Sequence, residues 1–172
     1  QKGGLGSASL VLGDGTTVGA LVAANPMGSA TTPNGHFWAA PFEIDGEFGG
    51  RGVDSSGGLG APLISLKSQA MLAQRANTTI AIVATDRALT KAQCHRLATA
   101  AHDGIARAVV PAHSPVDGDL IFALTMGQGE PATDIELGEI GHAAAICLTR
   151  AIARAIYAAR PAPGDLLPCW RP

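Results

Sequence analysis

The chain has 172 residues, of which 47% are hydrophobic and 15% are charged, and its formal net charge is -2. This length suits one domain with a sizeable core, and the lack of a basic cluster argues against a nucleic-acid-binding protein. No apolar run reaches the roughly 18 residues of a membrane span and no signal peptide opens the chain, so we expect no membrane contact and a cytoplasmic protein.

The three cysteines, Cys94, Cys147 and Cys169, are odd in number and widely spaced. This pattern favours reduced thiols over a disulfide framework or a metal site. Neither a phosphate-binding glycine loop nor a dinucleotide-binding fingerprint occurs, so we expect no cofactor and no metal. The chain opens at Gln1 without a methionine, and we therefore expect a preceding partner segment of the same protein.

Glycine turns alternate with short apolar runs in residues 1–28 and predict a β-hairpin. Its strands are expected at residues 8–12 and 17–24. Lys2 precedes the hairpin and Asn25 follows its second strand. Strand ends often carry site residues, although an asparagine before a proline is also an ordinary turn signal.

Residues 29–60 are rich in Gly, Pro, Asp and Thr, with scattered aromatic side chains. This composition predicts a long irregular excursion, and loops of such length tend to be functional or mobile. The segment could therefore line a substrate cleft or a subunit contact. Its acidic residues and His36 lack the spacing of a metal site, so we interpret them as solvated loop charges.

A strand is predicted to begin at Thr78, directly behind Asn77 and after the polar, irregular segment 66–75. The β-branched run that follows is typical of a strand covered on both faces. If the peptide bond before Thr78 were cut, this residue would carry a free α-amine beside its hydroxyl. Such an amine has a pKa of about 8 and can take the hydroxyl proton, which activates a weak nucleophile. The alternative is an ordinary strand start in which threonine serves β propensity.

Two helices and one further strand are predicted downstream. Residues 91–109 form the clearest helix, because Thr90 is a good N-cap and apolar residues recur at helical spacing. A Pro-containing break leads to a strand at residues 120–126, and a second helix follows at residues 134–160, with an acidic first turn that complements the helix dipole. Strands alternating with helices predict an α/β protein in which helices cover a sheet.

Two acidic residues, Asp117 and Asp119, lie just before the strand at residues 120–126. In extended backbone the two side chains point to the same side. Carboxylates so close repel each other, and they share a proton or stay charged only when a donor or a cation lies near. Solvated turn acids are the alternative at these positions.

Several stretches together resemble a known family. Residues 77–86, 102–108 and 113–119 look like parts of the C-terminal subunit of the DmpA-type self-cleaving N-terminal-nucleophile hydrolases. Residues 2–8 and 18–25 are similar to the end of that family's larger subunit. The resemblance covers most of the chain and is weakest in the long irregular segment and in the Pro-rich tail.

The resemblance implies an α/β fold of the four-layer αββα sandwich type, of which this chain is the C-terminal part. Residues 1–77 would be the C-terminal portion of the larger, α subunit, and residues 78–172 would be the smaller, β subunit, within one structural domain. The missing N-terminal half of the larger subunit would be the partner that completes the site. Processed heterodimers would then assemble into a homo-oligomer, by family likeness a tetramer.

The resemblance also implies roles for single residues. Thr78 would be the nucleophile, freed when the precursor cuts itself between Asn77 and Thr78. Asp117 and Asp119 stand where the family places the two side chains that orient the nucleophile and its amine. Asn25 matches the residue that helps to form the oxyanion hole.

Lys2 matches the lysine beside the nucleophile in this family. The Asp-Gly-Asp form combined with a threonine nucleophile is similar to the nylon-oligomer hydrolase branch, whose members cleave internal amide bonds of 6-aminohexanoate oligomers through a threonine acyl-enzyme. An aminopeptidase or β-peptidase acting on short peptides is the first alternative. An ornithine acetyltransferase-like enzyme and a non-catalytic assembly domain are the others.

Overall fold

The computed structural model describes residues 1–57, 77–115 and 117–170. They form a mixed α/β fold with one four-stranded sheet and two long helices. The predicted α/β class is therefore confirmed. The polar segment 66–75 lies outside the described residues.

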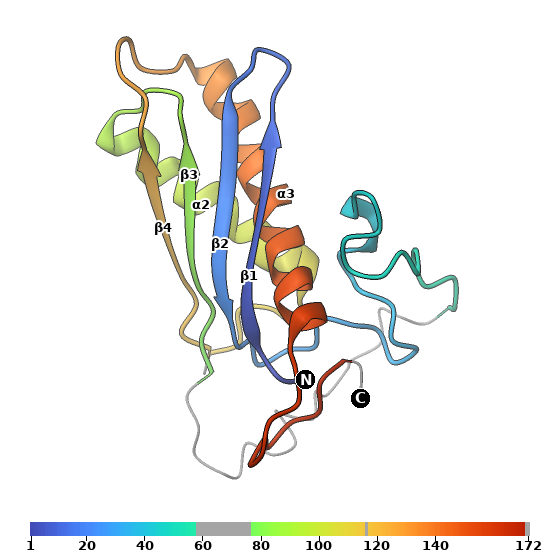
Figure 1. The fold of residues 1–172 in the computed structure, drawn as a ribbon. Helices are drawn as coiled ribbons and strands as arrows, with labels where there is room; N and C mark the ends of the chain where they lie inside the picture. The colour runs from blue at the N-terminus through green and yellow to red at the C-terminus, as the bar shows by residue number, and fades with distance from the viewer. Residues whose placement is uncertain (58–76, 116, 171–172) are drawn as a thin grey trace.

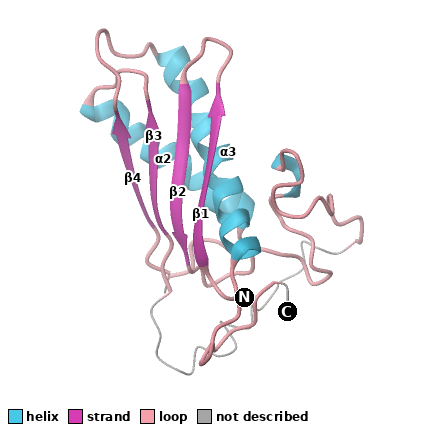
Figure 2. Cartoon of the chain, in the orientation of Figure 1, coloured by secondary structure: helices cyan, strands magenta, loops and turns pink. Residues whose placement is uncertain are grey.

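The sheet has the strand order β1-β2-β3-β4. Its strands are β1 (Gly4–Val11), β2 (Thr17–Ala24), β3 (Ile80–Thr85) and β4 (Leu120–Thr125). The pairs β1/β2 and β2/β3 are antiparallel, whereas β3 and β4 are parallel and are joined through the first long helix. The long helices, α2 (Lys91–Ala108) and α3 (Asp134–Ala158), lie on the same face of the sheet (Figures 1 and 2).

Both helices begin at the residues that the sequence predicts, because each has a complete capping box. The Thr90 side chain accepts from the Gln93 amide, and the Gln93 side chain accepts from the Thr90 amide. Thr133 and Glu136 do the same at the start of α3. Such reciprocal caps satisfy amides that a helix leaves unpaired at its first turn. Each helix ends within two residues of its predicted end.

The core lies between the sheet and the two helices. Its fully buried side chains include Val22, Val83, Leu97 and Leu148, each of which is 0% exposed. Burial of a side chain of this size stabilises the fold by about 1.5–3 kcal/mol. The helices also approach closely, because an added Cβ at Gly104 of α2 would lie 2.5 Å from the carbonyl oxygen of a residue in α3. The many small residues in the sequence thus serve close packing.

The other face of the sheet is apolar and exposed in the described structure. Ile80 is 47% exposed, Ile82 39% and Phe122 54%. In the described residues the helices cover one face of this strand, because strand alternation turns every second residue away from them. Cover on the other face stays a prediction. The described residues form one sheet layer and one helical layer.

The long excursion packs through its aromatic residues against α3 and the C-terminal tail. It contains the short helix η1 (Ala40–Phe42). The centroid of the Phe37 ring lies 5.3 Å from that of the Phe48 ring and 5.1 Å from that of the Trp170 ring. Two of its acids are not solvated, contrary to the sequence interpretation. Glu47 binds Arg150 of α3 through two hydrogen bonds.

Asp54 is the second acid of the excursion that binds other side chains. It is 9% exposed and accepts hydrogen bonds from Thr32 and Ser56. These bonds, led by that of the Thr32 hydroxyl, hold the pKa of Asp54 well below its usual range. The excursion is thus held to the domain by side-chain contacts.

Among the described residues, no helix is both long enough and apolar enough to cross a membrane. The same part of the chain contains no group of three side chains able to hold a metal ion. The cysteine thiols are unbridged, and burial raises the pKa of Cys147 to about 11.

Candidate active site

One end of the sheet collects most of the predicted site residues. Because β3 runs antiparallel to β2 and parallel to β4, the C-terminal end of β2 meets the N-terminal ends of β3 and β4. Asn25 follows β2, Thr78 precedes β3, and Asp117 and Asp119 precede β4. The chain's N-terminus lies at the same end (Figure 1).

The Asn77-Thr78 junction is held by backbone hydrogen bonds on both sides. The Thr78 amide donates to the Asn25 carbonyl oxygen at 3.1 Å, so Thr78 extends the pairing with β2 although β3 itself begins at Ile80. On the other side, Asn77 forms an isolated parallel bridge with Asp117. These contacts leave the junction little freedom to move relative to the two acids.

The Asn77 carbonyl oxygen accepts two hydrogen bonds. The Thr78 hydroxyl donates to it at 2.6 Å, and the Gly118 amide donates to it at 3.0 Å. The hydroxyl therefore lies beside the carbonyl group of the preceding residue, and a fixed N–H points at the oxygen of that group. Donors arranged in this way stabilise negative charge that develops on a carbonyl oxygen under attack.

Asp119 lies directly behind the junction. Its Oδ1 accepts from the Thr79 amide at 3.0 Å, and its side chain is only 5% exposed. Its Oδ2 is buried and lies 3.4 Å from the His113 Nδ1. The alternative of a solvated turn acid therefore does not describe Asp119.

Asp117 connects the junction with the segment after β2. Its Oδ2 accepts from the Met27 amide at 2.9 Å, two residues after Asn25. The two acids thus bind different parts of the backbone. Asp119 binds the amide of Thr79, just before β3, and Asp117 binds the turn after β2. Together they fix Thr78 relative to Asn25.

Gly118 is a site residue that the sequence reasoning missed. An added Cβ there would lie 2.9 Å from the Thr78 Oγ1 and 3.7 Å from its Cγ2. Because real Cβ atoms almost never come within 3.0 Å of a neighbouring atom, a larger residue would displace the hydroxyl. A glycine between two acidic residues is the sequence feature that could have indicated this close contact.

The charged group of Lys2, another predicted site residue, binds the C-terminal segment of the chain. Its Nζ donates to the Arg160 carbonyl oxygen at 2.7 Å and to Asp165 Oδ2 at 2.9 Å. The hydrogen bond from Lys2 is the main cause that lowers the pKa of Asp165. The ammonium thus binds the C-terminal tail, and its predicted place beside the nucleophile stays a prediction.

Residues 1–166 match the family model described as Peptidase family S58. The chain belongs to peptidase family S58. An uncharacterised aminopeptidase of Mycobacterium bovis is 38% identical to it, in an alignment that covers 99% of this chain and 52% of that protein. This S58 chain therefore spans about half the length of the curated relatives it matches.

Solved structures share the fold of this S58 chain. The L-aminopeptidase D-Ala-esterase/amidase of Ochrobactrum anthropi, described as a prototype for the serine aminopeptidases and a new variant among the Ntn hydrolase fold, gives a TM-score of 0.60 at 24% identity over 96% of this chain and 43% of its own. A Burkholderia sp. β-aminopeptidase gives a TM-score of 0.54 at 24% identity over 90% of this chain and 42% of its own. These likenesses concern the fold.

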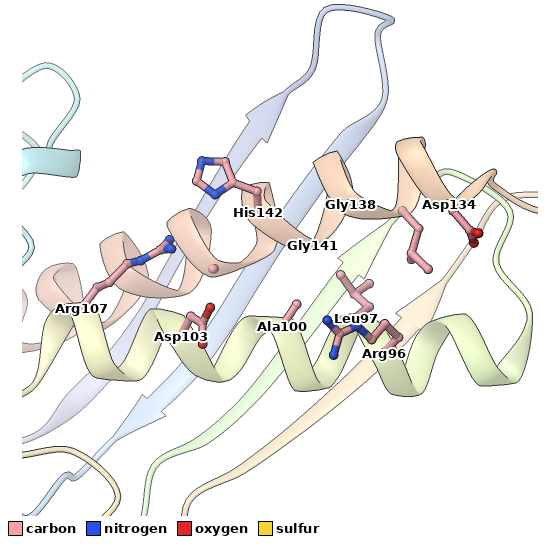
Figure 3. Close-up of a pocket in the computed structure, with 11 residues that line it drawn as sticks. Arg96, Leu97, Ala100, Asp103, Arg107, Asp134, Gly138, Gly141 and His142 are labelled. Atoms are coloured by element: carbon pink, nitrogen blue, oxygen red, sulfur yellow. The ribbon is translucent and has the colours of Figure 1, made fainter.

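A groove between α2 and α3 is a separate feature of this S58 chain. It has a volume of about 480 Å³, and none of the predicted site residues lines it. Figure 3 shows that its charged side chains, among them Arg96, Asp103 and Asp134, come from the two helices, with the sheet behind them. The groove is therefore distinct from the candidate site at the sheet end.

Proposed function

We propose that this chain is the part of an S58 amide hydrolase that carries its nucleophile, Thr78, and that the whole protein is an aminopeptidase or β-aminopeptidase. The observation that carries the proposal is the 2.6 Å contact between the Thr78 hydroxyl and the Asn77 carbonyl oxygen, with the Gly118 amide on the same oxygen. An ordinary strand start does not require a carbonyl group with two such donors.

The first step would be self-cleavage. The Thr78 Oγ1 attacks the Asn77 carbonyl carbon, and the Gly118 N–H stabilises the charge on the oxygen. The C–N bond breaks, the hydroxyl proton goes to the released amine, and an ester links Asn77 to Thr78. Water then hydrolyses this ester, which leaves a carboxylate on Asn77 and a free α-amine on Thr78.

The mature site would use the same atoms on a substrate. The α-amine of Thr78 takes the hydroxyl proton, and Oγ1 attacks the substrate amide carbonyl. Asn25 would donate to the oxyanion, and removal of one such donor typically costs about 100- to 1000-fold in kcat. The amine of the scissile bond leaves with the proton, and water releases the acyl group. Asp117 and Asp119 would hold the surrounding backbone through the hydrogen bonds described above.

The substrate class is chosen from the relatives. Their printed names refer to aminopeptidases, a β-aminopeptidase and an L-aminopeptidase D-Ala-esterase/amidase. They favour the aminopeptidase alternative over cleavage of 6-aminohexanoate oligomers. The oligomer hydrolase stays a second candidate, because Asp117 and Asp119 flank a glycine beside a threonine nucleophile as in that branch.

The partners follow from the same proposal. The exposed apolar face of the sheet, with Ile80 and Phe122, is the place for the second half of an αββα sandwich. The preceding part of the larger subunit would supply that half, and the assembled protein would form a tetramer. The cytoplasmic location likewise stays a prediction.

Mass spectrometry of the intact full-length protein tests the proposal. We expect a fragment that begins at Thr78, and its loss in the Thr78→Ala variant. A panel of short α-peptides, β-peptides and 6-aminohexanoate oligomers then separates the two substrate classes by the ends that are released. An uncleaved wild-type chain, or hydrolysis that survives in Thr78→Ala, would contradict the proposal.

A further inference from the structure

A histidine contacts the acid behind the nucleophile. His113 Nδ1 lies 3.4 Å from Asp119 Oδ2, and the other oxygen of the same carboxylate accepts from the Thr79 amide at 3.0 Å. His113, Asp119 and Thr79 thus form a line that ends one residue from Thr78. The line connects the surface to the candidate nucleophile, since the His113 side chain is 43% exposed and that of Asp119 is 5% exposed.

Asp119 requires a second partner. Its Oδ2 is buried and has no hydrogen bond among the described residues. A buried carboxylate oxygen without a donor is costly, so such atoms nearly always have one. At 3.4 Å the His113 contact is longer than a full N–H···O bond. Contacts of this kind in free enzymes often shorten when substrate is bound.

The backbone at His113 has an unusual conformation. Its φ is 53°, in the left-handed region that residues other than glycine rarely adopt. Strained residues of this kind persist only where the surroundings hold them, and they are concentrated at functional sites. The loop is held at both ends, because Val110 and Ser29 exchange two 2.9 Å backbone hydrogen bonds and the Asp117 amide donates to the Ser114 carbonyl oxygen at 2.9 Å.

A second histidine covers the first. The His102 ring of α2 lies 5.4 Å from the His113 ring. Burial lowers the pKa of His102, and the neighbouring His113 lowers it further, whereas Asp119 and Asp103 oppose the shift. The His102 ring therefore packs against the His113 ring, in a setting that disfavours its charged form.

We propose that His113 is a positioning residue for the Thr78 chemistry. Its Nδ1–H holds Asp119 Oδ2, so that Oδ1 keeps the Thr79 amide, and with it Thr78, aligned with the Asn77 carbonyl before cleavage and with the substrate afterwards. This inference rests on the proposed function of Thr78. None of the sequence motifs assigned a role to this histidine.

Two substitutions at one position test the inference in the full-length protein. His113→Ala removes the donor, whereas His113→Asn keeps an N–H donor at a similar distance from the backbone and tolerates a positive φ. We expect His113→Ala to slow self-cleavage and to lower kcat by about tenfold or more with KM little changed, because a small misplacement of reacting groups has effects of this size. His113→Asn should recover most of this loss.

His95→Ala is the matched control, because His95 is an exposed histidine of the same helix as His102. It should leave self-cleavage and kcat unchanged. The inference is overturned if His113→Ala retains wild-type kcat and self-cleavage, or if both His113 variants are equally impaired with lowered Tm. Failure of the proposed function is distinguishable, because in that case Thr78→Ala itself stays active.

Discussion

The two ends of the sheet differ in how their polar groups are satisfied. At the end opposite the candidate site, Asp86 accepts from the Thr17 amide at 2.8 Å, and the Thr125 hydroxyl donates to the Arg87 carbonyl oxygen at 2.6 Å. Arg87 also reaches both carboxylate oxygens of Glu136, at 3.0 and 3.2 Å. Both helix N-termini are capped at this end.

The site end contains buried polar atoms that the described residues do not satisfy. Asp119 Oδ2 and Thr79 Oγ1 are buried without a hydrogen bond among those residues. His113 has a strained backbone at the same end. Buried unsatisfied groups are rare and strain costs free energy, so both concentrate where chemistry requires them. The comparison supports the proposal that the unsaturated end carries the site, whereas the saturated end serves stability.

The largest effect is expected from Thr78→Ala. This change removes the proposed nucleophile, so self-cleavage should stop and amide hydrolysis should fall by at least about 1000-fold. Thr78→Ser keeps a hydroxyl at the same position and should retain measurable cleavage. Intact mass and initial rates on a short peptide measure both. Equal activity of the alanine and wild-type proteins would remove the functional difference between the two ends.

Gly118→Ala should have the next largest effect. The added Cβ would lie 2.9 Å from the Thr78 hydroxyl, and displacement of the nucleophile should lower kcat by about 100-fold. Gly138→Ala in α3 is the matched control, because an added Cβ there meets nothing within 4 Å. It should leave kcat unchanged and raise the free energy of unfolding by about 0.5–1 kcal/mol. A fully active Gly118→Ala variant would contradict the crowded geometry of the site.

Arg87→Ala tests the opposite end. It removes the bonds from Arg87 to Glu136 and to the Glu130 carbonyl oxygen. We expect Tm to fall by a few degrees at most, because both side chains are partly exposed, while kcat and self-cleavage stay unchanged. A scanning thermal melt beside a rate assay checks this. A large loss of kcat at unchanged Tm would show that this end also serves the reaction.

The smallest expected effect is on how the melting temperature depends on pH, through the carboxyl group of Glu136. Hydrogen bonds from Thr133, and then from Arg87, lower the pKa of Glu136 below its ordinary value of 4.5. The folded state therefore favours the carboxylate, and this contribution is present above pH 4.5 and is lost as the pH falls through the lowered pKa. In Glu136→Gln the melting temperature should depend less on pH in that acidic range. Glu139→Gln, on the exposed side of the same helix, should melt with the wild-type pH dependence.

Much of the fold could be predicted from local sequence patterns. The hairpin turn, the period of α2 and the two N-caps depend on residues a few positions apart. The site residues Thr78, Asp117, Asp119 and Asn25 came from a family resemblance, and the structure gathers them at one end of the sheet. Their catalytic roles stay predictions.

The sequence by itself thus determined the elements, because helix periodicity, capping and turn chemistry act over short distances along the chain. Only the tertiary structure decided which segments meet. The parallel pairing of β3 with β4 places Asn77 opposite Asp117, and the turn after α2 directs His113 at Asp119. The first contact joins residues far apart in sequence, and both depend on register and packing that no local pattern encodes.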